Sequence, residues 1–226
     1  MWQKVHPLWM RVGIMKSWPC EWFAKDQKTQ AAFVVEDILL RQYFEKEYQN
    51  ASIAKLVIRK TAHEVELIIF TSKVWVLMWK NGEKIKELET MLTQKFAKQF
   101  KITLKEVKVP EFSAKIMAEY VAQQLENRMP FRKVAKTVLQ KVMGKGAVGI
   151  KIQIWWRLGG TDIARTEKFI DGTVALQTFR SDIDYHYLQA HTKYGTLWVK
   201  VWISKGTIYQ KSPSKKSQAA ALLEAA

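Results

Sequence analysis

The sequence predicts an α+β protein built from two domains. Its 226 residues suffice for two domains of ordinary size. In the first half, segments with apolar residues at helical spacing are interleaved with segments rich in β-branched residues. In the second half, two helical segments precede a long strand-rich stretch. The hydrophobic fraction of 48% is typical of a chain with a packed core.

The first domain is expected to span residues 29–108, after an extended N-terminal arm at residues 1–28. Pro7, Gly13 and Pro19 punctuate this arm and argue against a helix there. The expected elements are a helix at 29–48, strands at 53–59 and 65–70, a short helix at 73–79, a loop at 80–82, a helix at 83–98 and a strand at 102–107.

The second domain is expected to span residues 109–210, because Val109-Pro110 interrupts the pattern. The expected elements are helices at 112–127 and 131–143 and strands at 149–156, 162–170, 181–190 and 196–203. Two helices and four strands form a layered module in which the sheet buries one face beneath the helices. The basic, then Ala-rich stretch at 211–226 is expected to be a disordered tail.

The charge balance predicts a polyanionic partner. Lys and Arg number 37 against 21 Asp and Glu, a formal net charge of +16. Nucleic acid is favoured, since neutralising phosphates releases counterions. An anionic membrane surface is the alternative, but it usually requires a basic amphipathic helix with a strong apolar face. No apolar run is long enough to cross a bilayer, so no membrane partner is expected.

The single cysteine, Cys20, excludes a disulfide framework and a multi-cysteine zinc site. It fits a reducing compartment, and the N-terminus lacks the apolar core of a signal peptide. The expected location is therefore the cytoplasm, or an organellar matrix if the gene is organellar.

Three features suggest contacts with phosphates. The loop at Trp79, Lys80, Asn81 and Gly82 would present backbone N–H groups and a helix N-terminus. A Gly-x-x-Gly sequence there would be the backbone clamp of a KH domain, but Trp79 takes the first position. Taken alone, these four residues favour an ordinary turn between helices over a phosphate-binding loop.

The second feature is a helix carrying Arg132, Lys133, Lys136 and Lys141 without an acidic residue, which indicates either an anion-binding face or a solvated one. The third is a Gly159-Gly160 turn bracketed by arginines. It favours either close backbone approach to RNA or a plain hairpin turn.

Asp182 and Asp184 are the best candidates for catalysis, since paired carboxylates can hold Mg²⁺ or transfer protons. Pairing with basic residues of the same chain is the simpler interpretation. The sequence has no phosphate-binding glycine loop and no nucleophile elbow, so neither an enzyme nor a cofactor is expected.

Several ordered stretches carry a family resemblance. They are Gln3-Lys4-Val5-His6-Pro7, Phe131-Arg132-Lys133, Arg157-Leu158-Gly159-Gly160, Asp182-Ile183-Asp184-Tyr185 and Val199-Lys200-Val201-Trp202-Ile203. With these motifs the chain resembles the bacterial-type small-subunit ribosomal protein three family, from its first residues to about 209. The resemblance implies a prokaryotic-type (type II) KH domain followed by a ribosomal α+β domain.

The resemblance also implies a function and partners. The chain would bind ribosomal RNA in the head of the small subunit, beside small-subunit proteins ten and fourteen. It would line the messenger RNA entry channel near proteins four and five, where Arg132, Lys133 and Lys136 assist unwinding. The ribosomal RNA contacts would be Lys4, His6, Arg11, Arg157, Gly159, Gly160 and Arg165. A free-standing KH-type regulator of single-stranded RNA is the alternative function.

Tryptophan stands at positions 2, 9, 75, 79, 156 and 198, where the family has glycine, and at 155, where a small residue is usual. Glycine serves where φ is positive or backbones approach closely, and tryptophan does neither cheaply. Our hypothesis is that UGA codons read as glycine were translated as tryptophan. The alternative is a diverged protein with new aromatic stacking surfaces.

Overall fold

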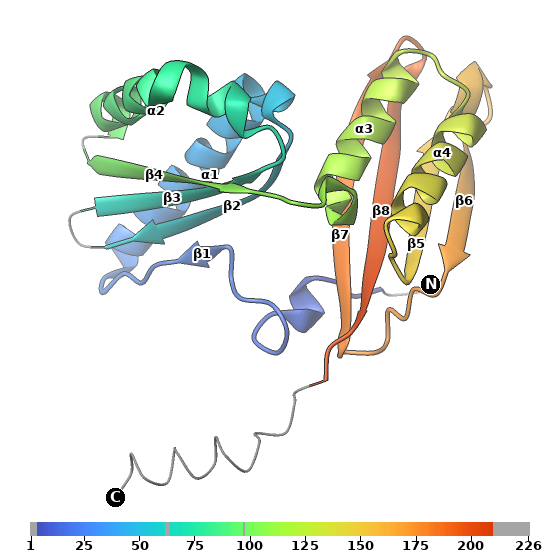
Figure 1. Ribbon diagram of the computed structural model, residues 1–226, viewed down its shortest axis with the longest axis horizontal. Coiled ribbons are helices and arrows are strands. Elements are labelled where there is room, and N and C mark those ends of the chain that lie inside the picture. Colours follow the sequence, from blue (N-terminus) through green and yellow to red (C-terminus); the bar gives the residue numbers. More distant parts are fainter. Residues whose placement is uncertain (1–3, 62–63, 97, 210–226) are drawn as a thin grey trace, which may run out of the picture.

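The computed structural model describes residues 4–61, 64–96 and 98–209, without the side chains of residues 50 and 79–84. The stretch expected to form a disordered tail, 211–226, lies outside the described residues. Two α+β halves stand side by side, joined by the segment after β4, and the N-terminal arm runs beneath both (Figure 1). The predicted fold class is therefore confirmed.

The first half is a four-stranded sheet covered on one face by two helices (Figure 1). Its strand order is β1 (Cys20–Glu21), β2 (Ile53–Lys60), β3 (Glu64–Thr71) and β4 (Gln99–Glu106). The strands β2 and β3 are antiparallel, whereas β1 and β4 join the sheet in parallel. The helix α1 (Gln27–Glu47) places Leu40 and Phe44 one turn apart on the sheet, where both are buried.

The loop expected at residues 80–82 is absent from the structure. Instead α2 (Val74–Phe96) is a single helix through that stretch. Leu77 is buried on the sheet before the expected break, and Leu88 and Leu92 are buried after it. A lone glycine costs a helix about 1 kcal/mol, which this burial on both sides outweighs. The prediction of two helices was wrong because Gly82 was given the weight of a helix terminator.

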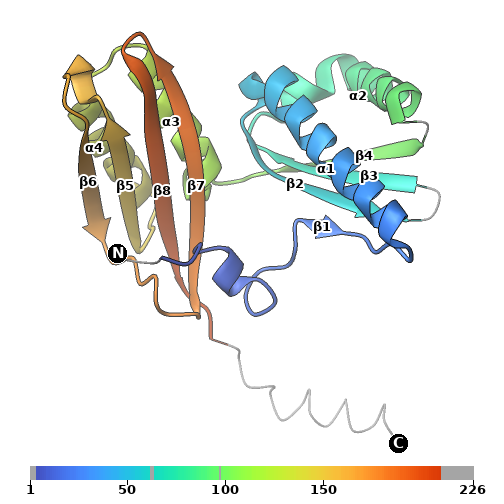
Figure 2. The same cartoon turned by 180° about the vertical axis from the view of Figure 1, so that it is seen from behind.

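The second half is an antiparallel sheet with α3 (Ala114–Glu126) and α4 (Phe131–Gly144) on one face (Figure 2). Its strand order is β6 (Arg165–Gly172), β5 (Gly149–Trp156), β8 (Gly195–Thr207) and β7 (Ser181–Thr192). This confirms the predicted arrangement of two helices and four strands. β6 begins three residues later than expected, because a 3-10 turn at Leu158–Gly160 follows β5.

The N-terminal arm connects the two halves (Figure 2). Its short 3-10 turn, Trp9–Arg11, lies against the start of β7, and β1 then pairs with β2 of the first sheet. A second link runs between the helices, where Lys115 of α3 lies 3.0 Å from Glu45 of α1. Within the described part of the chain, every helix is too short or too polar to cross a membrane.

Candidate nucleic-acid interface

The outer face of α4 is a basic surface that begins at the helix N-terminus. Val134, Val138 and Val142 point inward and are buried, so the intervening cations face solvent. The Arg132 side chain is 68% exposed, and Lys133 and Lys136 are also exposed. The first turn holds no acidic residue, so the N–H groups there add to the positive potential.

The structure brings Arg165 of β6 next to this face. The guanidinium groups of Arg132 and Arg165 lie 5.6 and 5.9 Å from the ring centre of Phe131. Both arginines also approach a single carboxylate, Glu167, at 3.9 and 3.7 Å.

Among the described residues, Lys133 and Lys136 form no ion pair. In the part of the chain that the structure describes, only one carboxylate, Glu167, lies against these four cations, which leaves a local excess of positive charge that an external anion can neutralise. We call Arg132, Lys133 and Lys136 the α4 basic face, which Arg165 flanks.

The arginine-flanked glycine turn is braced by the protein itself. Arg157 lies 2.6 Å from Asp162 and donates to the carbonyl of Thr161. Gly160 has φ +83°, and a Cβ there would come within 3.1 Å of the Tyr194 ring. Gly160 is thus required for packing against the β7–β8 hairpin, which favours the hairpin-turn interpretation of this motif.

Arg11 does not have the accessibility that an RNA contact needs. Its side chain is fully buried, and Nε donates to the carbonyl of Ser181 at 2.7 Å. The two terminal nitrogens donate to the carbonyls of Pro7, Leu176 and Thr178 at 2.7–2.9 Å. The expected RNA contact is therefore corrected: Arg11 holds the arm against the loop before β7.

The other two arm residues have different surroundings. Lys4 is exposed at the start of the described chain. His6 meets Tyr185 edge-on at 4.9 Å, and burial lowers the pKa of its imidazole. Burial therefore favours the uncharged imidazole of His6.

The expected KH loop is represented only by its backbone. Trp79, Lys80, Asn81 and Gly82 belong to α2, and their side chains lie outside the described residues. Inside a helix, backbone N–H groups bond within the helix and are not free to clamp a phosphate. In this conformation the four residues form no backbone clamp.

Asp182 and Asp184 are engaged within the protein. Lys16 lies 3.5 Å from Asp182 and 3.7 Å from Asp184. Asp184 also accepts a hydrogen bond from the N–H of Ala114 at 2.9 Å, at the start of α3. Within the described ranges, no group of three acidic, histidine or cysteine side chains is placed to hold a metal ion. The carboxylates thus pair with a basic residue, as in the simpler interpretation.

The tryptophans differ in how well the backbone accepts them. Trp156 has φ +109°, a conformation that disfavours any L side chain and suits glycine. Trp155 and Trp198 instead stack on neighbouring strands, with ring centres 6.0 Å apart. Trp9 is 77% exposed and Trp75 is 83% exposed, and position 2 lies outside the described residues. Among the tryptophans that the structure describes, Trp156 is the one whose backbone directly supports the glycine hypothesis.

Comparison with known protein families agrees with this two-part organisation. Residues 39–112 match the model of the KH domain, and residues 121–203 match the model described as ribosomal protein S3, C-terminal domain. Fold and matches together define a two-domain ribosomal-protein class in which a KH domain comes first.

Relatives narrow the class to one family. The chain is 42% identical to the small ribosomal subunit protein uS3 of Lysinibacillus sphaericus, over 96% of this chain and 98% of the relative. It is 43% identical to the uS3 protein of Bacillus cytotoxicus, over 96% of each chain. The chain therefore belongs to the small ribosomal subunit protein uS3 family.

Proposed function

We propose that this protein is a structural constituent of the small ribosomal subunit head, binds its ribosomal RNA, and presents the α4 basic face to messenger RNA at the entry channel. Family membership supports the ribosomal role. The observation that carries the messenger RNA contact is the surplus of exposed cations at the N-terminus of α4.

The proposed action is mechanical. Phosphates of an incoming strand would replace the missing counterions of the α4 basic face. Holding one strand there, while the translating ribosome pulls on the message, would disfavour re-pairing with the other strand. No covalent bond changes in this step, so it requires neither a nucleophile nor a metal ion.

Charge removal from the α4 basic face tests this function. A variant combining Arg132→Ala, Lys133→Ala and Lys136→Ala should assemble into small subunits, because none of these side chains is buried. Translation of a message with a stable hairpin should slow several-fold, while an unstructured message is translated normally.

A matched control combines Lys25→Ala, Lys28→Ala and Lys86→Ala. These lysines are exposed, lie far from α4 in the chain, and form no ion pair among the described residues. The control should translate both messages like the unaltered protein. Equal slowing in both variants, or failure of the α4 variant to assemble, would contradict the messenger RNA contact.

Further contacts in the subunit are proposed from the family resemblance. Lys4, His6, Arg157, Gly159, Gly160 and Arg165 would meet ribosomal RNA. Proteins ten and fourteen would lie nearby in the head, and proteins four and five at the entry, in cytoplasmic ribosomes. Crosslinking in purified subunits tests these contacts. A protein that binds single-stranded RNA but never sediments with subunits would instead be a free-standing KH regulator.

A further inference from the structure

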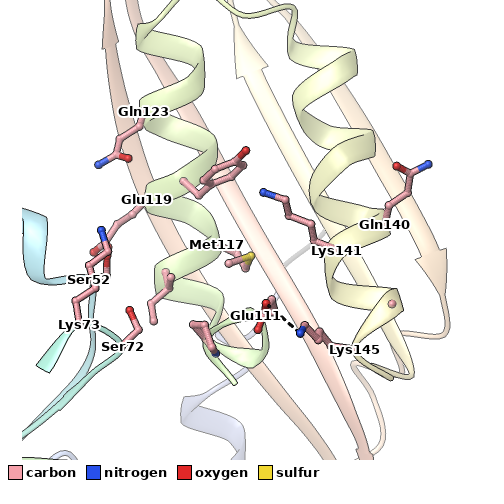
Figure 3. Close-up of a pocket in the computed structure, with 14 residues that line it drawn as sticks. Ser52, Ser72, Lys73, Glu111, Met117, Glu119, Gln123, Gln140, Lys141 and Lys145 are labelled. Atoms are coloured by element: carbon pink, nitrogen blue, oxygen red, sulfur yellow. Dashed lines mark ion pairs between the residues drawn. The ribbon is translucent and has the colours of Figure 1, made fainter. Parts of the chain in front are cut away.

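A crease between the two halves forms a cavity of about 560 Å³. One wall consists of the turns that carry Ser52, Ser72 and Lys73 in the first half (Figure 3). The other walls are α3 and the last turns of α4 (Figure 3). The cavity is large enough for a nucleotide-sized ligand.

Three lysines from two parts of the chain line this crease: Lys73 after β3, Lys141 on α4, and Lys145 at the C-cap of α4. Lys145 approaches Glu111 at 3.9 Å, the outer limit of an ion pair. Among the residues that the structure describes, Lys73 and Lys141 form no ion pair. The crease therefore carries more positive than negative charge.

Lys141 has an aromatic neighbour in place of an acid. Its Nζ lies 4.2 Å from the ring centre of Tyr120, and Figure 3 shows the side chain reaching from α4 toward α3. A cation–π contact at an exposed site contributes only about 0.5–1 kcal/mol, so an anion can readily recruit this ammonium group.

The remaining acid of the crease is only partly charged at neutral pH. Figure 3 shows Glu119 pointing from α3 toward Ser52 and Lys73. Burial raises the pKa of Glu119 to about 7, although Lys115 opposes the shift. A protonated carboxyl group donates a hydrogen bond, as do the hydroxyls of Ser52 and Ser72.

We propose that this crease binds the phosphodiester backbone of a single RNA strand, with Lys73, Lys141 and Lys145 facing its phosphates. The proposal rests on the RNA-binding function proposed above and adds a second contact surface, distinct from the α4 basic face. Cations and hydroxyl donors from three segments suit the tetrahedral phosphate group. No tryptophan lines the crease, so the proposal is independent of the glycine hypothesis.

The test uses the full-length protein and an oligouridylate of twelve nucleotides. Binding is measured over a salt series for the unaltered protein and for the combined Lys73→Gln, Lys141→Gln and Lys145→Gln variant. The slope of log affinity against log salt is negative, and each lost phosphate contact should reduce its magnitude by about 0.7, or by about 2 for all three contacts. The control for equal charge loss combines Lys25→Gln, Lys28→Gln and Lys86→Gln. Its salt slope should change by less than half as much as that of the crease variant.

Acetylation of lysines, located by mass spectrometry, adds a measurement that needs no variant. Bound oligouridylate should slow acetylation of Lys73, Lys141 and Lys145 at least fivefold, while Lys25 and Lys28 stay reactive. Equal protection by inorganic phosphate at the same concentration would overturn the RNA assignment in favour of a free anion. RNA binding that leaves all three crease lysines reactive would refute the crease alone, whereas no RNA binding by the protein would refute the proposed function too.

Discussion

Glycine at position 156 should make the protein more stable than alanine at the same position. Trp156 ends β5 with φ +109°, and its side chain is 44% exposed. A non-glycine residue in such a conformation costs of order 1–3 kcal/mol, whereas glycine in a strand costs roughly 0.5–1 kcal/mol in chain entropy. The partly buried indole ring is lost in both replacements, so Trp156→Gly should be about 1 kcal/mol more stable than Trp156→Ala.

Urea denaturation followed by tryptophan fluorescence and circular dichroism measures this difference. A stabilisation of 1 kcal/mol corresponds to about 2–4 °C in melting temperature for a protein of this size. The matched control compares Trp155→Gly with Trp155→Ala, because residue 155 has no positive φ and both replacements lose its stacking on Tyr187 and Trp198. At this strand position glycine should be about 0.5–1 kcal/mol less stable than alanine.

The stability difference between the glycine and alanine variants must have opposite signs at positions 156 and 155 for the argument to hold. If glycine were less stable than alanine at both positions, the positive φ would not be a source of strain. The backbone support for glycine at position 156 would then disappear. Peptide sequencing of the native protein decides the codon hypothesis directly, by finding glycine or tryptophan at that position.

Burial of Arg11 gives a prediction about stability. Arg11→Ala should lower the free energy of unfolding in urea by about 3–5 kcal/mol, because it leaves buried carbonyls unpaired. Arg11→Lys should lower it less, and equal losses would argue against the forked hydrogen bonding. Glu119 has a folded pKa of about 7 against an unfolded value of 4.5, so its stabilising proton is fully present below pH 4.5 and lost as pH rises through 7. After allowance for partial solvent exposure, Glu119→Gln should therefore have a free energy of unfolding about 1–2 kcal/mol above that of the unaltered protein at pH 8, but not at pH 4.5. A stability difference that does not change with pH would contradict this. Trp79→Gly should increase amide hydrogen exchange at residues 80–82 and strengthen the binding of single-stranded RNA severalfold. Unchanged hydrogen exchange would show that the helix tolerates both glycines.

The sequence predicted the elements whose hydrophobic period is regular. The helix α4 is an example, since Val134, Val138 and Val142 recur at one-turn spacing and leave the cations on the opposite side. The strands β5 and β8 were predictable because their apolar residues alternate or run unbroken between glycine turns. Local pattern was sufficient for both, because each element's own spacing determines which face is buried.

Contacts between distant segments could not be predicted in this way. Arg11 was expected to contact RNA from the family resemblance, yet three of its acceptors lie 165–170 residues away in the chain. The crease is similar, since Ser52 and Lys145 line one cavity only after two domains have folded and docked. A basic residue's type gives its charge, but its burial depends on which loop packs over it.

The helix α2 shows why the identity of one residue matters for the interface. With Trp79 in place, Gly82 is the only glycine in the helix and its cost of about 1 kcal/mol is tolerated. A second glycine at position 79 would roughly double that cost within a single turn, while the anchors Leu77 and Leu88 would remain on the sheet. The turn between them could then open into a loop whose N–H groups precede a new helix N-terminus, which is the geometry that binds phosphate. The choice between tryptophan and glycine at position 79 is therefore also a choice between a continuous helix and a backbone clamp.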